Sequence, residues 1–401
     1  MSYDMRIFTR SIYLILIAIV MVSCSDFNEP KNKHQFEVNE VSASMAAYSR
    51  LAAANAQDAA IAAAAMNQSI VDFLFRPTDE NRLAMESAWN NAHIAFVAIG
   101  TGTFEEAASD DPLTALIYRL DAWPIQPGYI DAIEYYPNSG IVNDITVELS
   151  RDSLRRQHGF SDAEEIVLGF HPLEYLIFAN EAIDYQLVEH RIQSSRDAGQ
   201  DNQVSQFSEE AGETSFESGS DSSPGANPVA RRRTLLELLG ADIAESLDQY
   251  ITAYREGIPN SFSSSSGQQQ ALQLVNLLLS VAYKHADNGF EESNLMLVSD
   301  ESHSRFSQTT HLNISLRLEN LGKIINEPVW LSRSLKKLDM QIEQDLQTTL
   351  AQGNLIIEKN QFDEADRARL PTIFSALRHQ LADLQLKLTN PYKPDQDPWQ
   401  P

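Results

Sequence analysis

Apolar residues recur every three or four positions along most of the chain, and no segment alternates like a half-buried strand over more than a few residues. The second predicted helix has Leu83, Trp89, Ile94 and Phe96 as its expected core contacts. The first is very rich in alanine, the strongest helix former. The helices predicted in the first half span residues 42–75, 77–99, 111–123 and 143–159.

A capping box follows the fourth predicted helix. Ser161 and Glu164 are three residues apart, a spacing typical of a helix start, so a short helix is expected over 161–168. Gly169 should interrupt it. His171 and Pro172 can then restart a helix, because proline is tolerated in a first turn.

The second half continues the helical pattern after a change in composition. Residues 194–228 are dominated by serine, glycine and acidic residues, which cannot bury enough apolar surface to offset their chain entropy, so a disordered insert is predicted. The chain is therefore expected to be all-α, with two tandem helical bundles over 41–193 and 229–390 and a tail over 391–401. Helices of the second half are predicted over 231–257, 268–286, 309–325, 330–352 and 364–388.

The N-terminus has the pattern of a secretory signal. Arg6 and Arg10 precede a short apolar run, and Ser23 stands directly before Cys24, the only cysteine in the chain. This arrangement is similar to a bacterial lipobox, although methionine replaces the usual leucine. It predicts a signal peptide over 1–23, lipid attachment at Cys24 and a polar tether over 24–40. Ser25 favours the outer membrane, facing the periplasm, over the inner membrane; a plain signal peptide is the alternative.

The composition of the chain excludes several classes of ligand and site. The formal net charge of −26 disfavours nucleic-acid binding, which needs a surplus of Lys and Arg on one face. A lone cysteine excludes internal disulfides and thiolate metal sites. The chain has no H-E-x-x-H, no G-x-S-x-G and no phosphate-binding glycine loop. Protein partners are not indicated, and membrane contact is expected only through the lipid.

His171 and Glu174 stand three residues apart inside the apolar run 167–178, and this spacing places both on one face of a helix. They could bind a metal ion, relay a proton, or only bond to each other. Zinc takes about four donors, so further ligands would have to come from elsewhere in the fold. Residues available in principle are His93, Glu301, His303 and His311.

Two other segments carry unusual side chains. Residues 120–144 hold three prolines and four aromatics, among them Trp123 and Tyr129, which could line a groove for a sugar or a peptide; packing over a bundle end is the commoner role. Residues 300–312 group Glu301, Ser304 and Ser307 with His303 and His311. Helix capping is favoured there over a polar cluster facing the His–Glu pair.

Three of these stretches, taken in order, resemble the imelysin-like family, which includes insulin-cleaving peptidases and iron-regulated envelope proteins. The family hallmark G-x-H-x-x-E reads Gly169 to Glu174 here. The proline-rich block is similar to "RLDAWPIQPGYID", and the C-terminal block to "ESHSRFSQTTHLNI". The resemblance implies an all-α fold with the site between two helical domains. It also implies a metal cofactor, iron or zinc, or a metallopeptidase reaction with Glu174 as ligand or base.

One helix departs from the family pattern. Many relatives carry W-x-x-A-R-x-x-Y-x-x-T-E, whereas this chain reads "WNNAHIAFVAIG". His93 stands in place of the arginine, Phe96 in place of the tyrosine, and Ile99-Gly100 in place of Thr-Glu. A ligand or base of the family is therefore replaced, and His93 is the residue that could compensate.

The sequence predicts an envelope lipoprotein that binds a metal ion, a metal complex or another small ligand through His171 and Glu174. The alternatives are a metallopeptidase and a glycan- or peptide-binding protein that uses Trp123 and Tyr129. Additional site residues are expected among Glu301, Ser304, Ser307 and His93.

Overall fold

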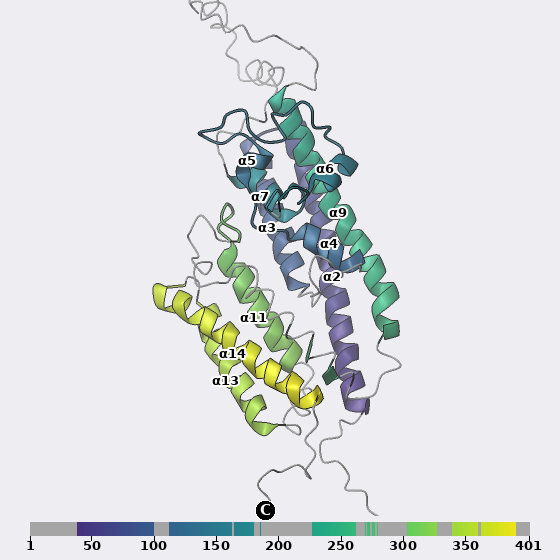
Figure 1. The fold of residues 1–401 in the computed structure, drawn as a ribbon, viewed down its shortest axis with the longest axis vertical. Coiled ribbons are helices and arrows are strands. Elements are labelled where there is room, and N and C mark those ends of the chain that lie inside the picture. Colours follow the sequence, from purple (N-terminus) through teal and green to yellow (C-terminus); the bar gives the residue numbers. More distant parts are fainter. Residues whose placement is uncertain are drawn as a thin grey trace, which may run out of the picture.

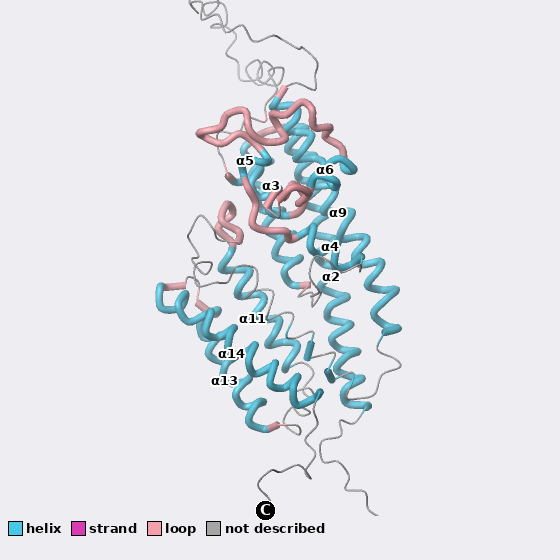
Figure 2. The backbone as a smooth tube through the Cα atoms, in the orientation of Figure 1, coloured by secondary structure: helices cyan, strands magenta, loops and turns pink. Residues whose placement is uncertain are grey.

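The computed structural model describes residues 38–99, 112–162, 164–179, 185, 227–261, 303–326, 339–359 and 362–389, with isolated positions between 269 and 279. Within these ranges the regular elements are all helices, and the only β-type pairing is an isolated bridge between Ile133 and Tyr136 (Figures 1 and 2). The predicted all-α class is confirmed. No helix in the described part of the chain is both long and apolar enough to cross a bilayer.

Three long helices form the frame of the molecule: α2 (Val38–Phe75), α3 (Asp79–Ala98) and α9 (Pro228–Ser261) (Figure 1). Helix α2 packs against both others. Its buried side chains are spaced alternately by four and three residues, the heptad pattern that keeps one seam facing a partner helix. Because most of them are alanines, the neighbouring backbones can approach closely. The buried residues of this seam are Ala52, Ala56, Ala59, Ala63, Met66, Ile70 and Phe73.

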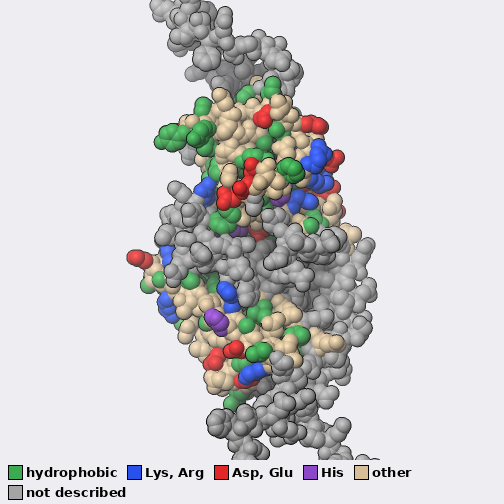
Figure 3. Space-filling model, in the orientation of Figure 1, with side chains coloured by type: hydrophobic (Ala, Val, Ile, Leu, Met, Phe, Trp, Pro, Cys, Tyr) green, Lys and Arg blue, Asp and Glu red, His purple; other side chains and the backbone are tan. Residues whose placement is uncertain are grey.

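Four short helices and a long loop cover one end of this frame: α4 (Pro112–Leu120), α5 (Pro127–Ile130), α6 (Arg151–Gln157) and α7 (Phe170–Phe178) (Figure 2). Ion pairs join them to α9. Arg155 of α6 lies 2.7 Å from Asp242, and Arg151 pairs with Glu245. Acidic and basic side chains lie next to each other on this side of the surface (Figure 3).

Three consecutive arginines at the start of α9 hold this end together. The Arg231 guanidinium lies 2.8–2.9 Å from four backbone carbonyl oxygens of residues 141–147. Arg232 pairs with Asp131, and Arg233 donates to the carbonyls of Leu74 and Tyr185. A basic run that would usually be solvated is here a set of internal clamps.

A second group of helices lies beside the frame: α11 (Thr310–Asn326), α13 (Met340–Ile357) and α14 (Glu364–Thr389) (Figure 1). Helix α11 contacts α3 and α13, and α13 contacts α14. Buried residues of both groups belong to one continuous hydrophobic core. The division into two tandem bundles stays a prediction.

Several predicted elements differ from the structure. The helix expected to reach residue 123 ends at Leu120, and an extended segment with a cis Trp123–Pro124 bond follows. Of the helix expected over 143–159, only Arg151–Gln157 forms. Asp144 Oδ1 accepts the Thr146 N–H at 2.9 Å in a local turn, so the upstream residues are not helical.

The capping box at residue 161 was also misread. The Glu164 N–H donates to Asp162 Oδ1 at 2.9 Å, and the described residues of 161–168 form turns and no helix. Asp162 therefore accepts the Glu164 N–H that Ser161 was expected to bind. Leu83 was wrong as a core residue as well, since 56% of its surface is exposed, whereas Trp89 and Phe96 are buried as predicted.

Several predictions lie outside the described residues. These are the signal peptide, Cys24 and the tether, nearly all of the 194–228 insert, the 391–401 tail and most of the 268–286 helix.

We expect Arg231→Met to lower the free energy of unfolding by about 2 kcal/mol, because several partly buried carbonyls lose their charged donor together. Arg156→Met is the matched control, because Arg156 is an exposed residue of α6, and it should change stability by no more than about 0.5 kcal/mol. Urea unfolding monitored by circular dichroism measures both. Equal effects in the two variants would mean that the Arg231 clamp contributes nothing.

Candidate metal centre

The backbone at Gly169 fixes where the site lies. This residue has φ +102°, a conformation that side chains other than glycine rarely adopt. A Cβ here would lie 2.4 Å from the Arg119 carbonyl oxygen and 2.7 Å from that of Leu120. Only glycine lets the start of α7 approach the end of α4 so closely. That approach brings His171 toward Asp121, the first residue after α4.

Two side chains hold the start of α7 in this position. The Trp89 indole N–H of α3 donates to the Phe170 carbonyl at 3.2 Å, and the Leu168 N–H donates to His158 Nδ1 at 3.2 Å. Every residue from Phe170 to Ile177 is buried, with Pro172 in the first turn as expected. The helix therefore places two ionisable side chains, His171 and Glu174, inside the protein.

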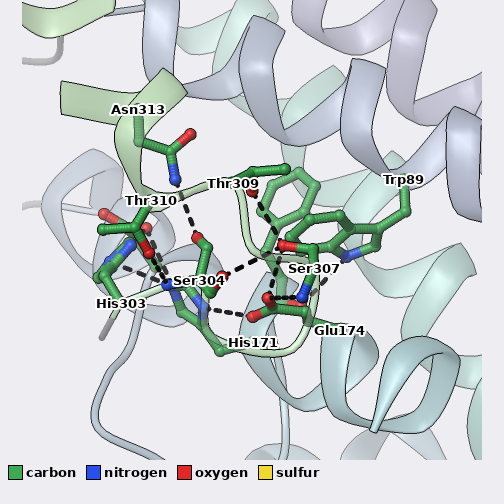
Figure 4. A network of polar contacts seen from close by, with 11 residues as sticks. Trp89, His171, Glu174, His303, Ser304, Ser307, Thr309, Thr310 and Asn313 are labelled. Atoms are coloured by element: carbon green, nitrogen blue, oxygen red, sulfur yellow. Dashed lines mark hydrogen bonds and ion pairs between the residues drawn. The ribbon is translucent and has the colours of Figure 1, made fainter. Parts of the chain in front are cut away.

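His171 is at the centre of a polar cluster (Figure 4). Its Nδ1 lies 3.3 Å from Glu174 Oε2, which places the two side chains on one face of α7. Its Nε2 points the other way, 3.1 Å from His303 Nε2 and 3.5 Å from Asp121 Oδ1. His303 Nε2 lies 3.6 Å from the same carboxylate oxygen.

His93 completes a group of four donors. Its ring stacks on Trp89, with centroids 4.7 Å apart, and lies edge-on to His171 at 5.5 Å. One ligand atom from each of His93, Asp121, His171 and His303 can be chosen so that all lie within 4.8 Å of one another. Zinc–nitrogen bonds are about 2.0–2.1 Å long, so two ligands of one tetrahedral ion are about 3.3 Å apart. The spacing within the His171, His303 and Asp121 set fits that value.

The pKa values of His171 and His303 are shifted in opposite directions. Burial alone would lower the pKa of His171, but hydrogen bonds to the Asp121 and Glu174 carboxylates outweigh it and raise that pKa. Burial, with His171 nearby, holds the pKa of His303 well below its ordinary value. His303 is therefore a neutral imidazole at pH 7, the form that ligates metals.

Arg317 of α11 contributes a positive charge on the far side of Asp121, with 3.9 Å between the guanidinium and Oδ2. Burial lowers the pKa of this arginine. Asp121 therefore lies between two histidines and an arginine.

The turn over residues 303–309 closes the cluster from the C-terminal half of the chain (Figure 4). Ser307 donates to Glu174 Oε1 twice, from its backbone N–H at 2.8 Å and from its hydroxyl at 2.7 Å. Ser304 is buried, accepts a bond from Asn313 Nδ2 at 2.9 Å, and donates its N–H to Thr310 Oγ1 at 3.0 Å. The segment read mainly as a helix cap therefore contacts the His–Glu pair directly.

The remaining predicted site residues lie as follows. Trp123 is half-buried with its ring 5.7 Å from that of His303, and Tyr129 is half-buried with its pKa raised by burial. His311 contacts Phe362 and is not in the cluster. Ile99, in place of a family threonine, is buried at the end of α3. Glu301 and Gly100 lie outside the described residues.

Asp121 and Arg317 were not singled out from the sequence. Asp121 lies within the proline-rich block that carries the family resemblance, so a signal was present, but no spacing rule connects it to a histidine 50 residues later. Arg317 looks like an ordinary charged position on a helix.

The comparisons with known proteins agree with this helical fold. A family model described as Imelysin, peptidase M75, matches residues 52–384. The chain belongs to the imelysin family. An imelysin-like protein from Psychrobacter arcticus 273-4, solved by crystallography, is similar in structure with a TM-score of 0.58 at 14% sequence identity. The similarity covers 88% of this chain and 96% of that one. Comparison with curated proteins gives no match.

Three Gly→Ala substitutions separate the cost of a positive φ from the cost of the backbone clash at Gly169. We expect Gly169→Ala to cost about 3 kcal/mol of unfolding free energy, because positive φ and a backbone clash act together. Gly159→Ala, with φ +64° and open space around it, should cost about 1 kcal/mol. Gly322→Ala in α11, with open space and helical φ, should stabilise by up to about 1 kcal/mol. Thermal and urea unfolding measure the series, and a Gly169 variant no worse than Gly159→Ala would contradict the close-approach argument.

His158 makes stability depend on pH. Burial lowers its pKa from 6.5 to about 4, so between these values the unfolded chain binds a proton that the folded chain does not. Its contribution is complete above pH 6.5 and is lost progressively as the pH falls to about 4. We expect His158→Asn, whose amide oxygen can still accept the Leu168 N–H, to remove about 2 kcal/mol of this dependence. Urea unfolding of both proteins at pH 4.5 and 7.5 tests it; parallel losses in the two would rule out His158 as the source.

Proposed function

We propose that this imelysin-family chain is a lipid-anchored protein of the cell envelope that binds a divalent transition-metal ion as cargo. The metal would be held by His93, Asp121, His171 and His303. The single observation that carries the proposal is the convergence of these four buried or partly buried side chains from four separated parts of the chain.

The donor set defines the class of ion. Three imidazoles and one carboxylate suit zinc, ferrous iron and their neighbours, whereas calcium and magnesium prefer sites made of oxygen atoms. His93, Asp121 and His171 are each no more than 5% exposed, so their ligand atoms are shielded from water. Burying two imidazoles against one carboxylate is costly unless the groups are paired or coordinate a metal.

Glu174 favours binding over hydrolysis. A metallopeptidase needs a carboxylate or another group free to act as general base on a water molecule. Both oxygens of Glu174 are already engaged, Oε2 with His171 and Oε1 with Ser307. The peptidase alternative rests on the family name, and the glycan or peptide alternative rests on Trp123 and Tyr129.

The envelope location is supported by the sequence alone. Arg6, Arg10 and the apolar run that follows form a signal pattern, and Ser23-Cys24 ends it as a lipidation site would. A lipid on Cys24 would leave the helical part of the chain in the periplasm, joined to the outer membrane by the polar tether.

The metal content of the purified protein tests the proposal. The full-length chain, purified in detergent without chelator and incubated anaerobically with Zn²⁺ or Fe²⁺, should carry one ion per chain by mass spectrometry. Asp121→Asn and His171→Ala should each weaken retention by at least ~100-fold, more than the loss of an outer hydrogen-bonding partner usually costs.

His311→Gln is the matched control, because this histidine of α11 lies outside the cluster. It should retain the ion. A wild-type chain that holds neither metal, or variants that bind as well as the parent, would refute the proposal.

A further inference from the structure

The turn over residues 303–309 carries one proposed ligand, His303. It contacts α7 through Ser307, which donates two hydrogen bonds to Glu174, and through the Phe306 ring, which packs against Tyr175. Within the turn, Ser307 Oγ lies 2.9 Å from Thr309 Oγ1, and Ser304 is tied to α11 through Thr310 and Asn313. Within the part of the chain that the structure describes, the turn hydrogen-bonds to Glu174 through the two Ser307 donors, and His303 lies against His171.

Glu174 divides its two oxygens between two tasks. Oε2 faces His171 Nδ1, and in a neutral imidazole whose proton is on that nitrogen, Nε2 would be the atom that binds an ion placed between Asp121 and His303. Oε1 accepts both hydrogen bonds from Ser307. The four-residue group that could hold the ion does not include Glu174. This carboxylate therefore orients one ligand and ties down the segment that bears another.

The backbone conformation of the turn explains why the hydrogen bonds between Ser307 and Glu174 are needed. Gln308 has φ +60°, an unfavourable conformation for a residue other than glycine, which costs about 1–2 kcal/mol. Such a conformation persists only where the surroundings enforce it. Gln308 directly follows Ser307, so the two bonds to Glu174 act on the residue next to the strained one. Without them the turn would still close over the ion but would open more often, and each opening would carry His303 away from His171.

We infer that Glu174 is a positioning residue and not a metal ligand: it latches the 303–309 turn over the site and thereby sets how slowly the ion leaves. The inference rests on the proposed metal-binding function. It assigns the glutamate of the G-x-H-x-x-E motif to the hold on Ser307 and to the orientation of His171, and leaves Asp121 as the one carboxylate of the donor set.

Co²⁺ can distinguish a metal ligand from a residue that only holds the turn in place. Its visible absorption depends on the atoms that ligate it, and its rate of release into excess chelator measures how firmly it is retained. The full-length chain in detergent would be loaded with Co²⁺ as parent, Glu174→Gln, Ser307→Ala, the double variant and Asp121→Asn. We expect Glu174→Gln and Ser307→Ala to keep the parental band shape and one Co²⁺ per chain, yet to release the ion about 10–100-fold faster. Asp121→Asn should change the bands.

The double variant tests whether the two residues act as one unit. If they form a single latch, Glu174→Gln with Ser307→Ala should release Co²⁺ little faster than the faster single variant. Ser315→Ala removes another half-buried hydroxyl of this region, which donates to the His311 carbonyl within α11, and should leave the release rate unchanged.

The outcomes are distinct. Altered bands in Glu174→Gln together with a parental release rate in Ser307→Ala would make Glu174 a ligand and overturn the inference, as would unchanged rates in both. A parent that binds no Co²⁺ or Zn²⁺ would refute the proposed function, and the inference with it. If Glu174→Gln does not fold, the spectrum and release rate of Ser307→Ala still decide, because that change removes one hydroxyl.

Discussion

The contact between the backbone of Gly169 and the last carbonyls of α4 is the constraint on which the site depends. It places the first turn of α7 against the residue that follows α4, and so sets the distance between His171 and Asp121. Helix α4 is itself held from the opposite side, since Arg119 donates to Ser246 of α9 at 2.8 Å and pairs with Asp242. Helix α9 thus holds α4 in place, α4 packs against the start of α7, and α7 carries His171.

Around that histidine the protein uses two carboxylates with different surroundings. Asp121 faces the imidazoles and Arg317, whereas Glu174 faces one imidazole edge and a serine. Two carboxylates buried close together would repel each other without partners, and here each has its own set of partners. The aromatic rings of Trp89 and Phe170 surround His93 and limit its freedom to turn away.

Features that depend on residues close together in the chain could be predicted from the sequence, whereas contacts between distant residues could not. The helical class, the His171–Glu174 face and the proline in the first turn follow from spacings of a few residues, and the structure has all three. The capping box at Ser161 failed because Asp162 accepts the backbone N–H instead. The buried face of α2 is hard to predict because most of its residues are alanines. The pairings of Asp121 with His171, Ser307 with Glu174 and Arg231 with the 141–147 loop join residues dozens of positions apart. Each depends on how helices pack, which no short spacing encodes.

The tryptophans give the molecule a built-in optical reporter. Two of its four tryptophans lie beside the cluster, Trp89 stacked on His93 and Trp123 next to His303. Trp89 is fully buried and Trp123 is partly open to solvent, so their emission should fall at different wavelengths. A paramagnetic ion among the histidines would quench both, whereas movement of the 303–309 turn alone would alter chiefly the emission of Trp123. Intrinsic fluorescence can therefore distinguish filling of the site from opening of its cover without any added label.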